Sequence, residues 1–461
     1  NNINQMSVIL ETIGNATLII YEKGKSLIAT DPWFDTDPAY FGSWRLSHEF
    51  PKEQKDAVIN SRYIFISHFH PDHLNLLSLR HCKKSTILIA QHYGSRVEND
   101  LRAVGFNVIS LPSRKWIAIG NQTRIMLFNN ELQDSALLIE ITDNIGRKSL
   151  ILNLNDTGGF GFEKEVSEIS SSYKNSIYLN LHCWGDADMI NLFDKNNNRI
   201  EPIASKKFPV GKDIKNGLKR FKANIAIPFS THHQYQRRDS FWANNYVTPI
   251  ELMSEGFIND KDHKLLPAFQ KVIFKDGNYL AENLNPRKII INSPIHESNF
   301  GDNWDETLSK KQIKNCKDYF QSIESLFLNF QSIKLLVGGQ EYEMLSGSKG
   351  KTKIKFSVPK TSLMKAIRRE IFDDLLIGNF MKTQIINGSN LYNPDFTSSV
   401  AKYSDNGRVK TKNELEKYFN YYKHSRSKKD ALFKKITFIR NKARDLIGIN
   451  NITKLKYLLR K

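Results

Sequence analysis

The feature that most constrains this chain is a cluster of metal-binding residue types at the end of an apolar run. Tyr63–Ser67 is followed directly by His68-Phe69-His70-Pro71-Asp72-His73. A short run of β-branched and aromatic residues predicts a buried strand. Alternate residues of an extended chain point the same way, so we expect His68 and His70 to hold one metal ion. Pro71 then turns the chain and brings Asp72 and His73 to a second ion. Imidazole nitrogen with carboxylate oxygen suits zinc, iron or manganese.

The segments around this run indicate a layered α/β architecture. Between residues 7 and 228, apolar runs such as Ala16–Tyr21, Arg124–Phe128 and Leu150–Leu154 alternate with turns and helix-forming stretches. This pattern predicts large sheets covered by helices. We expect a catalytic domain over residues 1–300, with a polar, irregular extension at 240–330. A small α+β unit should follow at 331–400, including one helix over Ser362–Leu376, and a basic helical tail at 401–461.

Composition narrows the setting of the protein. No window of the sequence approaches 18 consecutive apolar residues and no signal-peptide pattern is present, which predicts a soluble protein. The three cysteines are scattered, which favours a reducing, cytoplasmic location.

Residues 402–461 hold 18 Lys or Arg against 5 Asp or Glu, so +13 of the formal charge of +19 lies in the tail. This tail could dock on an anionic membrane surface, which would make the protein peripheral to the membrane. Few aromatic residues lie among its basic residues, so nucleic acid is an unlikely partner. The alternative is a helix that packs on the body of the protein.

The His-x-His-x-Asp-His run resembles the motif of the metallo-β-lactamase superfamily, and other positions agree with it in order. The resemblance implies a four-layer αββα sandwich with a dinuclear metal centre. It also implies that Asp31 braces the metal loop and that Asp156, which follows Leu150–Leu154, bridges the two ions. A turn role is the alternative for Asp156. His232 or His233 would complete the second ligand set, and His232 is favoured because it lies closer to the strand end. Asp72 and Asp156 are the catalytic candidates.

One position departs from the superfamily pattern. Its hydrolases usually supply a third histidine from the loop after a middle strand, but residues 129–134 of this chain contain none. Glu131 or Asp134 is the oxygen donor that could take its place, with Glu131 preferred. A more anionic site favours iron or manganese over zinc.

A narrower resemblance is to the CMP-N-acetylneuraminate hydroxylase group, over roughly residues 7–250. It is carried by Asp31-Pro32-Trp33-Phe34, by Gly42-Ser43-Trp44 and by the order from Asp134-Ser135 to Asp156. It implies a non-haem diiron oxygenase that hydroxylates a nucleotide sugar, glycan precursor or similar metabolite. The Rieske domain of that group needs two Cys and two His. Residues 1–461 hold no such set, so we expect an external electron donor.

The competing prediction is a metal-dependent hydrolase of a phosphoester, lactone or amide, in which Asp156 orients a metal-bridging hydroxide. A degenerate site that serves only as a binding scaffold is disfavoured by the complete motif. For substrate binding, the loop aromatics Trp33, Trp44 and Trp184 could stack a sugar or base. Arg237 could clamp a phosphate or carboxylate. Packing under long loops and a plain surface role remain the alternatives for these four residues.

Overall fold

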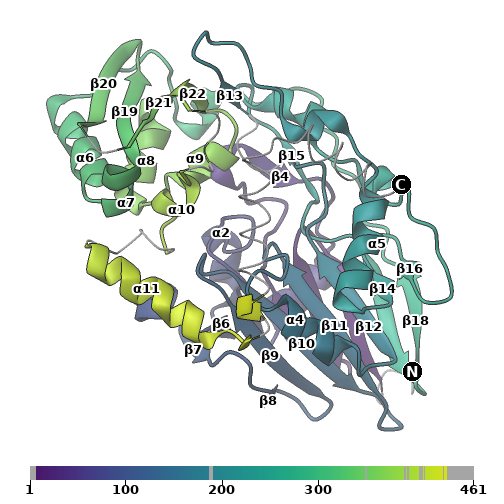
Figure 1. Ribbon diagram of the computed structural model, residues 1–461. Helices are drawn as coiled ribbons and strands as arrows, with labels where there is room; N and C mark the ends of the chain where they lie inside the picture. The colour runs from purple at the N-terminus through teal and green to yellow at the C-terminus, as the bar shows by residue number, and fades with distance from the viewer. Residues whose placement is uncertain are drawn as a thin grey trace, which may run out of the picture.

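Two large sheets dominate the computed structural model, which describes residues 7–185, 191–347, 350–388, 391, 394–403, 409, 411–428 and 430–432 (Figure 1). The first sheet has the order β18-β17-β1-β2-β3-β5-β6-β7. Its strands are β1 (Val8–Ile13), β2 (Thr17–Glu22), β3 (Lys25–Thr30), β5 (Tyr63–Phe65), β6 (Thr86–Ala90), β7 (Asn107–Leu111), β17 (Gln270–Lys275) and β18 (Asn278–Asn283). The second sheet has the order β16-β14-β12-β11-β10-β9-β8. Its strands are β8 (Ile117–Ala118), β9 (Thr123–Asn129), β10 (Ser135–Thr142), β11 (Lys148–Asn155), β12 (Asn175–Asn180), β14 (Ile225–Ala226) and β16 (Lys264–Leu265).

Side-chain alternation along the strands shows how these sheets are layered. Leu18 and Ile20 of β2 lie in the core between the two sheets, together with Ile151 of β11. The intervening Ile19 packs outward against the helices α1 (Lys52–Ile59), α2 (Leu76–Leu79) and α3 (Arg96–Ala103). Leu152 packs outward on the other side, against α4 (Glu163–Ser170) and α5 (Val210–Phe221). Both faces of each sheet are therefore buried, and the predicted αββα sandwich is confirmed.

The residues between 240 and 330, which we predicted to be irregular, supply strands to both sheets. β17 pairs antiparallel with β1, and β16 pairs parallel with β14. Val272 and Phe274 of β17 point into the core between the sheets, while the residues between them are partly exposed. This alternation over only six residues marks a half-buried strand, and the polar residues around it hid the pattern.

A second unit follows, which we call the C-terminal unit (residues 302–400). Its five-stranded sheet has the order β13-β22-β21-β19-β20, in which β13 is borrowed from the sandwich part of the chain. The strands are β13 (Leu192–Phe193), β19 (Phe330–Val337), β20 (Gln340–Ser346), β21 (Thr352–Ser357) and β22 (Lys382–Asn387). The helices are α6 (Lys310–Gln321), α7 (Glu324–Asn329), α8 (Lys360–Arg369), α9 (Asp373–Ile377) and α10 (Thr397–Val400).

The single helix predicted over Ser362–Leu376 is two helices. Glu370 takes a left-handed conformation, with φ of 59°, and ends α8. The N–H of Ile371 bonds the carbonyl of Ala366 at 3.0 Å, and the N–H of Glu370 bonds that of Ile367 at 3.3 Å, which is a Schellman motif. The apolar periodicity continues through this break, so periodicity alone could not show it. The break gives α9 its own direction.

Short elements connect these units. β4 (Trp44–Leu46) and β15 (His233–Tyr235) form a two-stranded sheet beside the sandwich. The 3-10 helices are η2 (Tyr40–Gly42), η3 (Arg80–Cys82), η4 (Tyr93–Ser95), η5 (Ile203–Lys206), η6 (Phe241–Tyr246), η7 (Ile250–Leu252) and η8 (Glu297–Phe300).

The described part of the tail packs on the sandwich. Helix α11 (Lys412–Ser425) buries Tyr418 and Tyr422, and the hydroxyl of Tyr422 lies 3.1 Å from Nδ1 of His92. The predicted basic helical tail extends to residue 461, but residues 433–461 lie outside the described residues. Among the helices that the structure describes, none has the length and apolar character needed to cross a bilayer.

Candidate metal centre

The His-x-His-x-Asp-His run lies where the carboxyl ends of parallel strands from both sheets meet. β3, β5 and β6 are parallel in the first sheet, and β11, β12 and β14 are parallel in the second. Asp31 directly follows β3, Asp156 directly follows β11, and His68 lies three residues beyond the end of β5. Polar side chains from distant parts of the sequence therefore gather at one edge of the sandwich, as ligand sites in sheets of this kind do.

Asp31 holds the start of the loop that carries the His-x-His-x-Asp-His run. Its carboxylate accepts hydrogen bonds from the backbone N–H of Ser67 at 2.8 Å and from the Ser67 hydroxyl at 2.6 Å. Its Oδ2 lies 3.1 Å from Nδ1 of His73 and accepts a bond from the amide of Asn155 at 2.6 Å. Asp31 and Asn155 both have positive φ, 40° and 50°. The strand ends are turned sharply so that these side chains meet, and Nε2 of His73 is left facing the cluster.

Three side chains form what we call the local group: His68, His73 and Asp156. Oδ2 of Asp156 lies 3.4 Å from Nε2 of His73 and 3.8 Å from Nε2 of His68. Both Nε2 atoms are buried and make no hydrogen bond within the described part of the chain. The hydroxyl of Ser230 holds the other oxygen of Asp156 at 2.6 Å. Two buried imidazole nitrogens and one carboxylate oxygen thus face one another at this point.

Three further side chains form what we call the inter-unit group: His70, Asp373 and Asp374. Nε2 of His70 lies 3.0 Å from Oδ2 of Asp373, a residue 303 positions away at the start of α9. Asp373 is fully buried and Asp374 is 5% exposed, yet Oδ1 of each makes no hydrogen bond to any residue that the structure describes. The C-terminal unit therefore contributes two carboxylates to the edge where the motif lies.

This arrangement differs from the predicted ligand sets. His68 and His70 fall in different donor groups, although their ring centroids lie only 4.9 Å apart with planes at 89°, and their sharing one ion stays a prediction. His68 groups with His73 and His70 turns toward α9. Asp72 lies beside His73, with 3.2 Å between Oδ2 and Nε2. Its carboxylate also accepts bonds from the hydroxyl of Tyr40 at 2.5 Å and the amide of Asn15 at 3.0 Å. Its role as a direct ligand stays a prediction.

Electrostatics at both groups favour a positive charge. Burial lowers the pKa of His70, but the hydrogen bond and charge of Asp373 and the charge of Asp374 outweigh it and raise the pKa to about 10. Burial also opposes the charged form of His73, but Asp72 and Asp156 raise its pKa well above the ordinary value. By contrast, burial and the neighbouring His73 hold the pKa of His68 well below normal, so its imidazole is neutral. A neutral imidazole among carboxylates can donate a lone pair to a cation.

The residues present fit a pair of metal ions. Each group offers three donors within 4.8 Å of one another, and its unsatisfied buried atoms would be costly without a cation to bind them. Two imidazoles with one carboxylate occur as ligands both in catalytic zinc sites and in non-haem iron sites, so the donor sets suit divalent metal ions. Side chains of His70 and Asp156 are 23% and 26% exposed, so solvent reaches both groups.

The prediction that Glu131 stands in for the missing histidine is not supported by its position. Its carboxylate forms an ion pair with Arg426, just beyond α11, and its carbonyl accepts a bond from the hydroxyl of Tyr418 at 2.5 Å. Glu131 belongs to neither donor group. The backbone of Asp134, the alternative, closes a turn with Asn130 through a 3.1 Å bond. Docking of α11 on this loop is the physical reason, and no local pattern in the sequence encodes such a contact between distant segments.

Neither His232 nor His233 lies in the two donor groups. Nε2 of His232 lies 3.2 Å from the carbonyl of Pro228 and its ring packs against Phe269. His233 stacks face to face on Trp44, with ring centroids 3.5 Å apart and planes at 1°. Ser230 has a φ of 61°, and this turn directs the Ser230 hydroxyl, instead of a histidine, at Asp156.

The predicted substrate residues are mostly structural. Trp33 is fully buried and donates to the carbonyl of Asp37, and Trp184 is buried and donates to the carbonyl of Phe208 at 3.1 Å. Trp44 is 3% exposed beneath His233. These three rings pack under loops, the alternative that the sequence left open.

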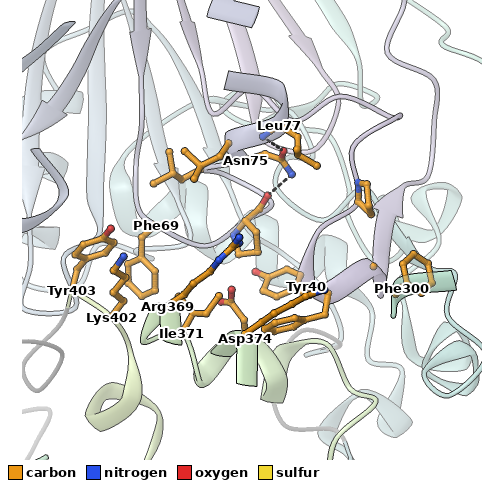
Figure 2. Close-up of a pocket in the computed structure, with 17 residues that line it drawn as sticks. Tyr40, Phe69, Asn75, Leu77, Phe300, Arg369, Ile371, Asp374, Lys402 and Tyr403 are labelled. Atoms are coloured by element: carbon orange, nitrogen blue, oxygen red, sulfur yellow. Dashed lines mark hydrogen bonds between the residues drawn. The ribbon is translucent and has the colours of Figure 1, made fainter. Parts of the chain in front are cut away.

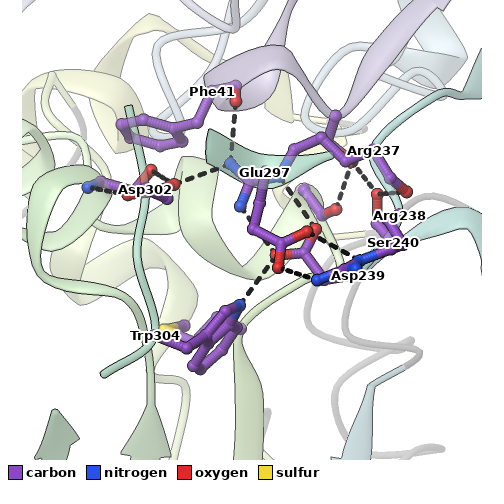
Figure 3. Close-up of polar contacts among 12 residues, drawn as sticks. Phe41, Arg237, Arg238, Asp239, Ser240, Glu297, Asp302 and Trp304 are labelled. Atoms are coloured by element: carbon purple, nitrogen blue, oxygen red, sulfur yellow. Dashed lines mark hydrogen bonds and ion pairs between the residues drawn. The ribbon is translucent and has the colours of Figure 1, made fainter. Parts of the chain in front are cut away.

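Arg237 is fully buried and makes its polar contacts inside the protein (Figure 3). Its guanidinium binds Asp239 through two bonds of 2.9 and 2.8 Å and Asp302 through one of 2.8 Å. Asp302 in turn accepts a bond from the N–H of Ser362, in the first turn of α8, at 2.8 Å. The clamp therefore fastens the C-terminal unit to the sandwich.

A cavity of about 740 Å³ adjoins the metal centre at the junction of the two units (Figure 2). Tyr40, which bonds Asp72, and Asp374 of the inter-unit group both line it. Its apolar lining includes Phe69, Leu74, Leu76, Leu77 and Phe300, and its basic lining is Lys365, Arg369 and Lys402. The lining of this cavity is thus part apolar, with a few cations close to the donor groups.

The sequence analysis missed Asp373, Asp374 and Ser230. A signal for the first two was present: the run Ile371-Phe372-Asp373-Asp374-Leu375-Leu376-Ile377 places two adjacent acids among apolar residues. Such a run predicts buried carboxylates, which need a cationic or hydrogen-bonding partner. Nothing in the sequence pointed to His70 as that partner.

No protein-family model matches the chain. Two facing sheets, helices on both outer faces and a His-x-His-x-Asp-His run beyond β5 occur together here. The chain has a metallo-β-lactamase fold. Among solved structures it is similar to a metallo-β-lactamase fold protein from Bacillus subtilis, with 9% identity and a TM-score of 0.33 over 58% of this chain and 100% of that one.

Among curated proteins, this metallo-β-lactamase fold chain is similar to cytidine monophosphate-N-acetylneuraminic acid hydroxylases. The one from Danio rerio is 29% identical over 126 residues, and the one from Asterias rubens is 33% identical over 110 residues. These matches cover 25% and 23% of this chain. The chain matches only about a fifth of the length of these relatives, 21% and 17%.

Proposed function

We propose that this chain is a non-haem diiron oxygenase that hydroxylates a small anionic metabolite such as a nucleotide sugar. The observation that carries the proposal is the local group, whose two imidazoles and one carboxylate match the donor composition of non-haem iron oxygenases. The additional carboxylates of the inter-unit group make the whole centre rich in oxygen donors, which favours iron over zinc. The partial similarity to sialic acid hydroxylases supports the same chemistry.

The reaction must balance in atoms and electrons. One atom of dioxygen enters a C–H bond of the substrate to give C–OH, and the other leaves as water. Each turnover therefore consumes two electrons and two protons. Iron, once bound by these groups, would supply oxygen activation and the redox change. We propose that the electrons come from a separate one-electron carrier, such as a reduced iron–sulfur protein.

The residues of the chain position and shield this chemistry. Asp31 fixes the tautomer and orientation of His73 through its contact with Nδ1, and the Tyr40 hydroxyl holds Asp72. Phe69 and Leu74 line the adjoining cavity and keep water from part of it. Substrate in this cavity would meet the metal centre from the side of His70 and Asp374.

Three basic side chains indicate the charge of the substrate. Lys365, Arg369 and Lys402 all line the cavity, and Arg369 extends into it from the end of α8 (Figure 2). Lys402 is paired with Asp100 at 3.0 Å, whereas the structure shows no ion pair for Lys365 or Arg369 among the described residues. A guanidinium suits the planar recognition of phosphate or carboxylate.

Replacement of Arg369 tests this substrate class. A charge-assisted hydrogen bond contributes about 1.5–3 kcal/mol, so R369A should raise KM for an anionic substrate about 10- to 100-fold with a smaller change in kcat. The matched control is R368A, which removes the neighbouring exposed arginine that does not line the cavity. Equal effects of the two substitutions would contradict a binding role.

The main experiment follows metal and oxygen together. Metal-free protein would be loaded anaerobically with ferrous iron, supplied with an external reductant, and exposed to ¹⁸O₂ with a panel of nucleotide sugars. We expect two irons per chain and a product that carries one ¹⁸O atom, detected by mass spectrometry. Two zinc ions as purified, with product formed without dioxygen and with oxygen from water, would instead establish the hydrolase.

A further inference from the structure

We propose that the C-terminal unit completes the metal centre: Asp373 and Asp374 bind one ion together with His70. This places one of the two metal sites across the junction of the sandwich and the C-terminal unit. The inference rests on the proposed function only for the identity of the metal, since the donor set itself is read from contacts in this structure.

Asp373 and Asp374 are buried without a full set of hydrogen-bond partners among the described residues. Asp373 and Asp374 are adjacent carboxylates at the start of a five-residue helix, and both are buried. Asp373 contacts His70 through Oδ2, but its Oδ1 and the Oδ1 of Asp374 are shielded from solvent and lack a hydrogen-bond donor among the described residues. Two buried carboxylates side by side repel each other and lose their hydration. A cation between them and the imidazole would offset both costs.

The bonded partner of this aspartate pair is an imidazole and not a lysine or arginine. The structure gives His70 as the ion-pair partner of Asp373, and it shows no Lys or Arg bonded to either carboxylate in the described part of the chain. Elsewhere in this protein, a buried carboxylate does receive such a partner. Asp302 is fully buried and pairs with Arg237. The partner of Asp373 is an imidazole, which can give up its proton and bind a metal ion, whereas the partner of Asp302 is a guanidinium, which cannot.

Three features of the fold fix the orientation of Asp373 and Asp374. Glu370 ends α8 in a left-handed conformation, which separates α9 from α8 and points its first residues at the motif loop. The Arg237–Asp302 clamp holds the start of α8 against the sandwich. The hydroxyl of Ser43, next to η2, donates to the carbonyl of Gly378 at the end of α9 at 2.6 Å. Both ends of the α8–α9 segment are thus fixed relative to His70.

The position of Asp374 connects this site to the substrate cavity. Asp374 belongs to the inter-unit group and also lines the cavity that holds Arg369. An ion at the inter-unit group would therefore lie at the inner end of that cavity. In this arrangement the C-terminal unit supplies both a metal site and the cations that receive an anionic substrate.

The test compares metal binding by full-length variants. We would measure Co²⁺ stoichiometry and affinity by calorimetry and elemental analysis for the wild type, for D373N/D374N and for H68A. The matched control is D318N, which removes an exposed carboxylate on α6 of the same unit. We expect two ions for the wild type and D318N, and one each for D373N/D374N and H68A. The affinity of the lost site should fall at least about 100-fold.

Thermal melting separates a ligand role from a structural one. If the aspartates are ligands, metal-free D373N/D374N should melt no lower than metal-free wild type, and the rise in Tm on adding metal should shrink. The inference is overturned if the double variant still binds two ions with unchanged affinity, or if its metal-free form is strongly destabilised while both ions bind. A wild type that binds two ions, and a double variant that binds one, but no oxygen-dependent product, would leave this inference standing and reject the oxygenase.

Discussion

The two donor groups differ in how far apart their residues lie in the sequence. The local group joins His68 and His73, beyond β5 of the first sheet, to Asp156, at the end of β11 of the second sheet, so the packing of the two sheets sets its geometry. The inter-unit group joins His70 to residues 303 positions away, and its geometry depends on how a second unit docks. The first group is a property of the fold, whereas the second is a property of an interface. Perturbations of the fold and of the interface should therefore affect the two groups separately.

The largest expected effect comes from removing the carboxylate of the local group. D156A leaves two imidazoles without their anionic partner, and metal contributes several kcal/mol to catalysis in such sites. We expect activity to fall at least about 10⁴-fold, equivalent to roughly 5 kcal/mol of barrier. Steady-state turnover with stoichiometric metal analysis checks this result. Retention of a fully occupied inter-unit site in D156A would confirm that the groups are independent, and loss of both ions would contradict it.

The second largest effect should come from replacing Arg237, whose ion pairs with Asp239 and Asp302 join the two units. R237M leaves Asp302 and Asp239 without their cation, and breaking a buried pair in this way costs about 3–5 kcal/mol. Because the clamp holds α8, the variant should lose affinity at the inter-unit group and keep the local group loaded. Denaturant unfolding and metal titration measure the two parts. R238M is the control: its ion pair with Glu297 is exposed on the arginine side, so the expected change is about 0–1 kcal/mol.

A smaller loss of metal affinity is expected on replacing Asp31, which contacts His73 but belongs to neither donor group. D31N keeps the size of the side chain but weakens its contact with Nδ1 of His73. Substitutions at such supporting contacts typically cost 10- to 100-fold in metal affinity, so we expect a loss of about that size, confined to the local group. Competition with a chromophoric chelator would measure it. An equal loss at both groups would show that the loop is one rigid piece.

The smallest effect on metal binding should be at Glu131. Its carboxylate pairs with Arg426 instead of facing the donor groups, so E131Q should keep two ions with affinities within about twofold of wild type. Leaving Arg426 partly unpaired should instead weaken the docking of α11, at a cost of about 1–3 kcal/mol. Limited proteolysis within residues 411–428 would report that change. Loss of one ion in E131Q would restore Glu131 as a ligand.

Much of the sandwich could be predicted from the sequence because its strands are buried on both faces and appear as continuous apolar runs. β17 was missed because it is short and only half-buried, and its alternation is hidden among polar residues. The break between α8 and α9 was missed because periodicity continues across Glu370. Only the backbone conformation of Glu370, with its positive φ, reveals it.

For the metal centre, the sequence identified the motif loop and Asp156, while the structure groups their side chains differently from the predicted ligand sets. A spacing rule can place two histidines on one strand, but it cannot show where the chain turns, and the turn separates His68 from His70. Likewise, Asp373 and Asp374 could be recognised as unusual buried acids, but not matched to His70, because no local pattern encodes contacts between distant segments.

The distance in sequence between the residues of each group also determines the order in which the two groups can form. During synthesis from the N-terminus, the residues of the local group are all present once residue 156 has been added, and Ser230, which holds Asp156, follows later. His70 meets its aspartates only after residue 374 has been added and the C-terminal unit has docked. A newly made chain therefore passes through a stage in which every residue of the local group exists and two of the three residues of the inter-unit group do not. The inter-unit group is the second of the two that the chain can assemble.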